Sequence, residues 1–129
     1  NGWVGASKLW KKHSIEETGH AEKIINYMQD RDCIPIIPAT TLPQQKFEGI
    51  EDIVAKSDEH EILISSQWKK IASEAMKKAD LMTFELAQQF LLEQREEEMK
   101  VIYWLDRIEM YKKTNKPLGD LDEEMGDKV

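Results

Sequence analysis

The segment LWKKHSIEETGH, residues 9–20, carries the pattern on which the fold prediction rests. It lies inside a longer run with helical hydrophobic spacing. One stripe of this run contains Trp10, His13, Glu17, His20, Ile24 and Met28. Residues three apart on a helix lie on the same face, so the Glu17 carboxylate and the His20 imidazole can bind one metal ion together. A carboxylate in an apolar position is costly to desolvate unless a cation compensates it. The segment therefore predicts a helix that carries metal ligands toward the core of a helical bundle.

Two further runs with helical spacing place carboxylates in the same way. Glu61 interrupts the apolar seam of one run, and Gln94 and Glu97 lie in the middle of the seam of the other. The first seam includes Val54, Trp68 and Ile71, and the second includes Phe90 and Trp104. Both seams repeat apolar residues in alternating steps of four and three, which is the spacing of bundle cores. A Glu-x-x-His pair together with glutamates from other helices is the ligand pattern of carboxylate di-metal bundles. Three helices that each carry such a carboxylate near mid-length predict a shared metal centre.

Each of these residues also has an ordinary structural alternative. A Glu three residues before a His occurs often by chance, and Glu61 could be a seam carboxylate paired with a lysine. The run 96–98 could be a solvated helix face with partners such as Lys100, and this is the interpretation we favour for Glu98. If the centre exists, oxygen ligands with one imidazole favour iron or manganese over metals that prefer thiolates, and zinc would also be accepted.

Composition narrows the classes of function. The chain has 129 residues with 33% charged side chains and a net charge of -7, which argues against a nucleic-acid partner. No run approaches the roughly 20 apolar residues of a membrane span. The single Cys33 suits a reducing compartment and lacks the companion cysteines of a zinc or iron–sulfur site. These features predict one soluble acidic domain over residues 1–129, located in the cytoplasm, without nucleic-acid or membrane partners.

The order of elements is simple. We expect long helices over 4–31, 46–78 and 81–113, a loop over 32–45, and an acidic tail over 114–129 with at most a short helix near 121–125. Three prolines exclude a helix from the loop. Its fourteen residues can stretch about 46 Å at roughly 3.3 Å each, which allows a crossover between parallel helices. Only a residue or two near Asp80 separates the second and third helices, which predicts an antiparallel hairpin.

Taken together, residues 9–20, His60-Glu61, Thr83-Phe84 and residues 92–98 resemble a prokaryotic non-haem ferritin, with a likeness that extends over residues 9–111. The resemblance is specific to a subgroup. Bacterioferritins and rubrerythrins carry Glu-x-x-His on two helices. In the third helix of this chain, no histidine lies three residues after Glu93 or Glu97. Thr18 stands where a bacterioferritin carries a haem-ligating methionine. The resemblance thus implies an all-α ferritin-like bundle that binds iron and no haem.

The resemblance also implies a ferroxidase centre. Glu17 would bridge two irons, His20 would bind the first iron, and the second would be bound by Glu61 and Glu97. Gln94 would be a hydrogen-bonding neighbour of these ligands. Two Fe(II) ions held close together can pass two electrons to one O2, and hard carboxylates favour the Fe(III) product.

Three further glutamates, Glu16, Glu93 and Glu96, match the additional iron site that bacterial ferritins have beside this centre. The resemblance therefore implies such a site here. Oxidised iron would then move to a mineral store. The function implied is therefore iron binding and storage, with Fe(II) oxidation if the centre is complete.

One departure from the family affects both fold and activity. Ferritins have four long helices, and this sequence starts at Asn1-Gly2, just before the family's second helix. We therefore expect a four-helix bundle that lacks its first helix and the Glu ligand that the helix carries. The open apolar side would be covered by the rest of a longer gene product, which we favour, or by other copies in a homo-oligomer. The alternatives are a non-catalytic assembly module on the ferritin scaffold, or another di-metal enzyme that activates oxygen.

Overall fold

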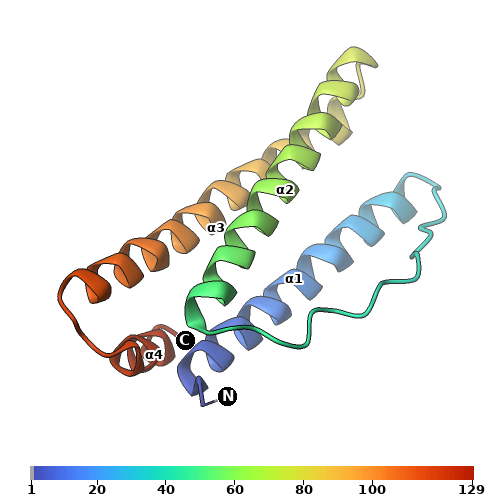
Figure 1. The fold of residues 1–129 in the computed structure, drawn as a ribbon. Helices are drawn as coiled ribbons and strands as arrows, with labels where there is room; N and C mark the ends of the chain where they lie inside the picture. Colours follow the sequence, from blue (N-terminus) through green and yellow to red (C-terminus); the bar gives the residue numbers. More distant parts are fainter. Residues whose placement is uncertain (1) are drawn as a thin grey trace. The chain divides into compact units, whose positions relative to one another are not determined.

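The computed structural model describes residues 2–129 and contains four α-helices in the order α1 (Val4–Asp30), α2 (Ile50–Lys77), α3 (Leu81–Lys113) and α4 (Leu118–Asp127) (Figure 1). None of the residues in this range belongs to a β-strand, so the all-α prediction is confirmed. The chain divides into two compact units. One is the α2–α3 hairpin, and the other contains α1 and α4.

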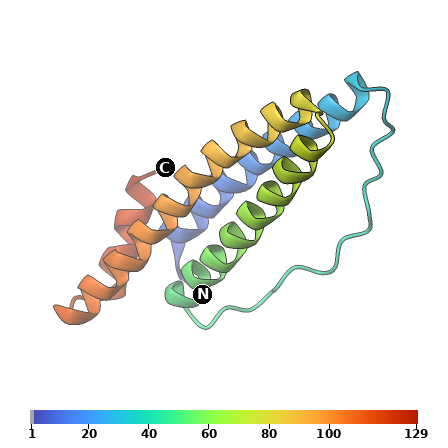
Figure 2. The same cartoon turned by 90° about the horizontal axis from the view of Figure 1, so that it is seen from above.

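The hairpin unit is closed by a tight turn between α2 and α3. Asp80 caps α3, because its carboxylate accepts hydrogen bonds from the backbone N–H of Thr83 at 3.2 Å and from its hydroxyl at 2.7 Å. At the far end, Lys112 of α3 forms an ion pair with Glu51 of α2 at 2.6 Å. The two helices lie side by side and run in opposite directions (Figures 1 and 2). The hairpin that the short connection predicts is therefore present.

Large apolar side chains fill the space between α2 and α3. The rings of Trp68 and Phe90 stack with centroids 4.2 Å apart and planes 4° from parallel. Val54, Trp104 and Ile108 are buried on either side of this stack. Aromatic pairs of this kind add to the free energy gained from burial alone. The seam departs from the expected register at Ile71, which is 40% exposed, while its neighbour Ala72 is buried.

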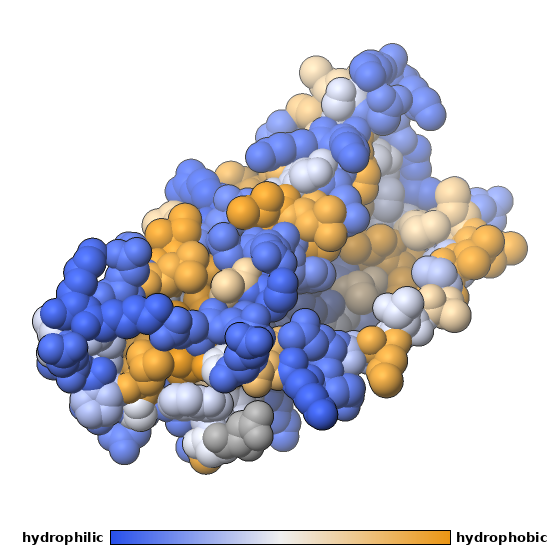
Figure 3. All heavy atoms as spheres, in the orientation of Figure 1, coloured by the Kyte–Doolittle hydropathy of each residue, from blue (hydrophilic) through white to orange (hydrophobic). Residues whose placement is uncertain are grey.

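The segment between α1 and α2 contains no helix over residues 31–49, in agreement with its three prolines. Its large apolar side chains are exposed: Ile34 and Ile36 are each 87% exposed, Ile37 75% and Leu42 82%. Figure 3 shows apolar atoms among hydrophilic ones on the face that it draws. Exposed apolar side chains in such numbers are unusual for a monomer.

The three expected long helices are present, and the unit that contains α1 and α4 corrects the expected tail, for which the sequence allowed at most a short helix near 121–125. Residues 118–127 form a fourth helix whose Leu121 and Met125 are fully buried. Asp122 accepts hydrogen bonds from the first-turn amides of α1, from Gly5 N–H at 3.0 Å and from Ala6 N–H at 2.8 Å. These donors have no partner within their own helix, so α4 caps α1. The tail is helical because its apolar side chains are buried in this unit and because α1 supplies amide donors to Asp122.

Gly5 permits this close approach of α4. A Cβ atom at that position would lie 1.6 Å from the backbone oxygen of Asp122. Across all the residues described, no helix combines the length and the apolar character that a membrane span requires.

Candidate metal centre

The predicted ligand pair of α1 lies on one side of the helix. The Nδ1 atom of His20 is 3.4 Å from the Oε2 atom of Glu17, with side chains 29% and 58% exposed. The helical phase of residues 4–30 produces this proximity, because residues 17 and 20 are one turn apart. An imidazole nitrogen and a carboxylate oxygen at this separation can bind one cation together.

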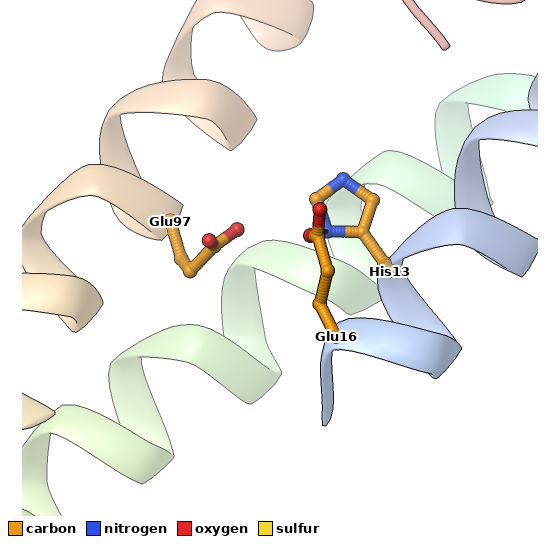
Figure 4. Close-up of side chains that lie close together, drawn as sticks. All are labelled: His13, Glu16 and Glu97. Atoms are coloured by element: carbon orange, nitrogen blue, oxygen red, sulfur yellow. Dashed lines mark ion pairs between the residues drawn. The ribbon is translucent and has the colours of Figure 1, made fainter. Parts of the chain in front are cut away.

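A second pair of the same kind precedes it on α1. The Nδ1 atom of His13 is 3.6 Å from the Oε2 atom of Glu16, and the side chains are 28% and 40% exposed (Figure 4). Glu16 was expected in an additional iron site, whereas its proximity to His13 was not expected. The signal was present in residues 13–20, where a His-x-x-Glu pair directly precedes the Glu-x-x-His pair.

In the hairpin unit, Gln94 contacts the predicted ligand of α2. Its side-chain amide donates hydrogen bonds to the backbone oxygen of Glu61 at 3.1 Å and to the carboxylate Oε2 of Glu61 at 2.5 Å. Gln94 is buried and Glu61 is half-buried. The amide therefore restricts the orientation of the Glu61 carboxylate, as groups next to metal ligands commonly do.

The predicted ligands of α3 differ in their exposure. The Glu97 side chain, also drawn in Figure 4, is 14% exposed and forms an ion pair with Lys100 at 2.7 Å. Glu93 is half-buried and Glu96 is exposed. A cation that binds Glu97 would compete with Lys100 for the carboxylate.

The structure corrects the interpretation of Glu98 as a solvated surface residue. Glu98 is half-buried, and its carboxylate accepts a short hydrogen bond from the hydroxyl of Ser65 on α2. The physical reason is helical phase, because residues 94 and 98 are one turn apart and both face α2. A run of three glutamates does not reveal which of them faces the partner helix. The polar Ser65 in the α2 seam was the available signal.

The predicted ligands thus divide between the two units. α1 carries Glu16, Glu17 and His20, whereas the hairpin carries Glu61, Glu93, Glu96 and Glu97 with Gln94 beside them. All of them offer carboxylate oxygen or imidazole nitrogen, the donors that suit iron, manganese and zinc.

Comparison with known proteins decides the family. A family profile described as "Ferritin: Ferritin-like domain" matches residues 1–111. This chain belongs to the ferritin-like family. The resemblance to a prokaryotic non-haem ferritin is thereby confirmed, and it is supported by two bacterial relatives.

The first relative is the probable bacterial non-heme ferritin-like protein of Haemophilus influenzae, 26% identical over 125 residues that cover 97% of this chain and 76% of that protein. The second is the bacterial non-heme ferritin of Escherichia coli O6:H1, 26% identical over 121 residues that cover 94% of this chain and 73% of that protein. This ferritin-like chain thus spans about three quarters of the length of both relatives.

A solved structure agrees in fold. The open pore ferritin of the archaeon Archaeoglobus fulgidus matches with a TM-score of 0.91 and 22% identity, over 97% of this chain and 77% of that protein. At this identity the likeness establishes the fold alone. The ferritin-like helical fold expected from the sequence is therefore confirmed.

Proposed function

We propose that this ferritin-like chain binds and stores iron, and that it oxidises Fe(II) at a centre formed by Glu17, His20, Glu61 and Glu97. Membership of the ferritin-like family supports the storage function. The observation that carries the site is the Glu17–His20 pair, whose ligand atoms lie 3.4 Å apart on one face of α1.

Each residue has a defined part in this proposal. Glu17 would contribute to the binding of both iron ions, His20 would bind the first, and Glu61 and Glu97 would bind the second. Two Fe(II) ions then lose one electron each to one O2, which takes up two protons to give hydrogen peroxide, and two Fe(III) ions remain. Carboxylates stabilise the harder Fe(III) product and so contribute to the driving force.

Gln94 supports the centre as a positioning residue. Its amide hydrogen bond occupies one lone pair of Glu61 Oε2 and leaves the other oxygen atom of the carboxylate available to a cation. Because the same amide also contacts the Glu61 backbone, the carboxylate is held relative to its own helix. Loss of such a supporting hydrogen bond commonly lowers metal affinity about 10–100-fold.

Three further glutamates, Glu16, Glu93 and Glu96, would hold iron on its way from the oxidising centre to the store. The exposure of Glu96 is consistent with a position from which iron can leave. No residue is assigned to haem, because Thr18 offers no ligand suited to that role.

We also propose that the chain forms a homo-oligomer in the cytoplasm, without nucleic-acid or membrane partners. The support is the set of exposed apolar side chains in the segment 31–49, together with Leu92 and Met99 of α3, which are 63% and 61% exposed. Burial of this surface by further copies would be favourable.

One experiment tests the function. The protein is titrated with Fe(II) in air, and iron content, oxidation and mass of the assembly are measured together. Storage predicts many irons per subunit and a rise of Fe(III)-oxo absorbance, and Glu61→Ala should slow that rise. Binding of two irons or fewer per subunit, with no mineral, would instead support a non-catalytic module on the ferritin scaffold.

A further inference from the structure

The two His/Glu pairs of α1 have the same internal geometry. In each pair the histidine presents Nδ1 to Oε2 of a glutamate three residues away, at 3.6 Å for His13 and Glu16 and at 3.4 Å for His20 and Glu17. The order of the residues is reversed, so the two glutamates are adjacent and the histidines lie outside them.

These separations fit ligands of a common ion. Metal bonds of about 2.0–2.2 Å with angles of about 90–110° place two ligand atoms roughly 2.8–3.6 Å apart. An N–H···O hydrogen bond would bring the same atoms to about 2.7–3.2 Å. The separations of both pairs fall within the range expected for ligands of one ion, and they also satisfy the longer limit of a His–Glu ion pair.

The helix also relates the two pairs to each other. His13 and Glu17 are four residues apart, which corresponds to about 6 Å along the α1 axis and about 40° around it. Ions held by the two pairs would thus follow each other along one side of the helix. Both histidines are partly sheltered, with side chains 28% and 29% exposed.

We propose that His13 is a metal ligand, and that together with Glu16 it binds a divalent cation next to the ion of the Glu17–His20 pair. This inference rests on the proposed iron function and adds a nitrogen donor to a position that otherwise consists of carboxylates. Imidazole suits Fe(II) and Zn(II), whereas Mg(II) and Ca(II) prefer oxygen ligands alone. His13 therefore makes the Glu16 position selective for Fe(II) over the abundant hard cations.

Zinc is the appropriate probe, since it accepts the same donors and undergoes no redox reaction. The full chain is loaded with Zn(II) in the presence of excess Mg(II). Bound zinc is counted after dialysis, and anomalous diffraction at the zinc edge locates it. His13→Ala and Glu16→Gln are compared with the wild type. His60→Ala is the matched control, because His60 is an exposed histidine of α2.

We expect anomalous density between His13 and Glu16 in the wild type. Both variants should lose that density and bind zinc at this position at least about tenfold more weakly, since even the loss of an outer-shell group costs about 10–100-fold. His60→Ala should retain both. Circular dichroism verifies that the variants remain helical, and Glu16→Gln keeps the size of the side chain if His13→Ala alters the fold.

Two results separate this inference from the proposed function. If His13→Ala retains the zinc count and density of the wild type while His20→Ala loses zinc, His13 is not a ligand and the iron function stands. If zinc contacts neither α1 pair, and Glu61→Ala changes nothing, both the inference and the proposed centre are wrong.

Discussion

The side-chain amide of Gln94 joins α3 to α2 by donating to both the backbone oxygen and the carboxylate of Glu61, at 3.1 Å and 2.5 Å. Gln94 is only 7% exposed, so water cannot readily replace it. The bond thus serves two purposes. It satisfies polar atoms inside an apolar interface, and it fixes a carboxylate that we assign to the metal centre.

We expect Gln94→Ala to destabilise the protein by about 1–3 kcal/mol, because the polar atoms of Glu61 lose their buried donor. Zinc affinity should fall about 10–100-fold, since the carboxylate would no longer be oriented. Urea unfolding and zinc titration measure the two effects. Gln89→Ala is the control, since Gln89 is an exposed glutamine of the same helix. Equal effects of the two substitutions would contradict the role given to Gln94.

Ser65→Ala should also destabilise the hairpin, by about 1–3 kcal/mol, because the half-buried Glu98 carboxylate would lose its hydroxyl donor. Ser73→Ala, at an exposed position of α2, should change the free energy of unfolding by no more than about 0.5 kcal/mol. A double-mutant cycle with Glu98→Ala isolates the pair. A coupling energy near zero in that cycle would show that the Ser65–Glu98 bond adds no stability.

The long helices could be predicted because each has an apolar repeat of its own. The residues 54, 68, 90 and 104 mark the core of the hairpin in both sequence and structure. α4 could be predicted only in part, as at most a short helix near 121–125. Ten residues with Leu121 and Met125 as the buried apolar pair give too short a repeat, and the helix depends on a contact between Asp122 and Gly5, 117 positions away.

The candidate site was predictable in its residue types and less so in its contacts. The spacing of Glu17 and His20 determines their proximity on any α-helix, so the sequence was sufficient for that pair. Glu98 was misassigned, because the choice among three consecutive glutamates depends on the rotation of α3 against Ser65. The proximity of His13 to Glu16 was overlooked because His13 was interpreted as one member of the stripe on its helix.

Gly5→Ala should release α4 from α1, since its Cβ would lie 1.6 Å from the Asp122 backbone oxygen. Such an overlap cannot be relieved by a side-chain rotation. We expect faster amide exchange over residues 118–127 and cleavage of the tail by proteases. Gly19→Ala is the control, because a Cβ there meets nothing within 4 Å and alanine favours helix by up to about 1 kcal/mol.

Asp122→Asn separates steric fit from electrostatics at the same contact. The two carboxylate oxygens accept separately, Oδ2 from Gly5 and Oδ1 from Ala6, so the single amide oxygen of asparagine keeps only one of these bonds, and the negative charge beside the N-terminus of α1 is lost. Asp122→Asn should therefore cost less than Asp122→Ala, which loses both bonds and is expected to cost roughly 0.5–2 kcal/mol. Chemical denaturation with a probe in α4 measures both. If neither variant were less stable than the wild type, Asp122 would not act as a cap.

Divalent metal should raise the thermal stability of the folded chain, because the ligands come together only in the folded state. At a free metal concentration 100 times the dissociation constant, one site adds about 2.7 kcal/mol to the free energy of unfolding. Melting curves in excess zinc and in excess chelator measure the difference. Glu61→Ala should remove most of it, whereas Glu59→Ala, at an exposed carboxylate of α2 paired with Lys56, should leave it unchanged. Curves that coincide with and without metal would show that these carboxylates and imidazoles do not form an inner-shell metal site.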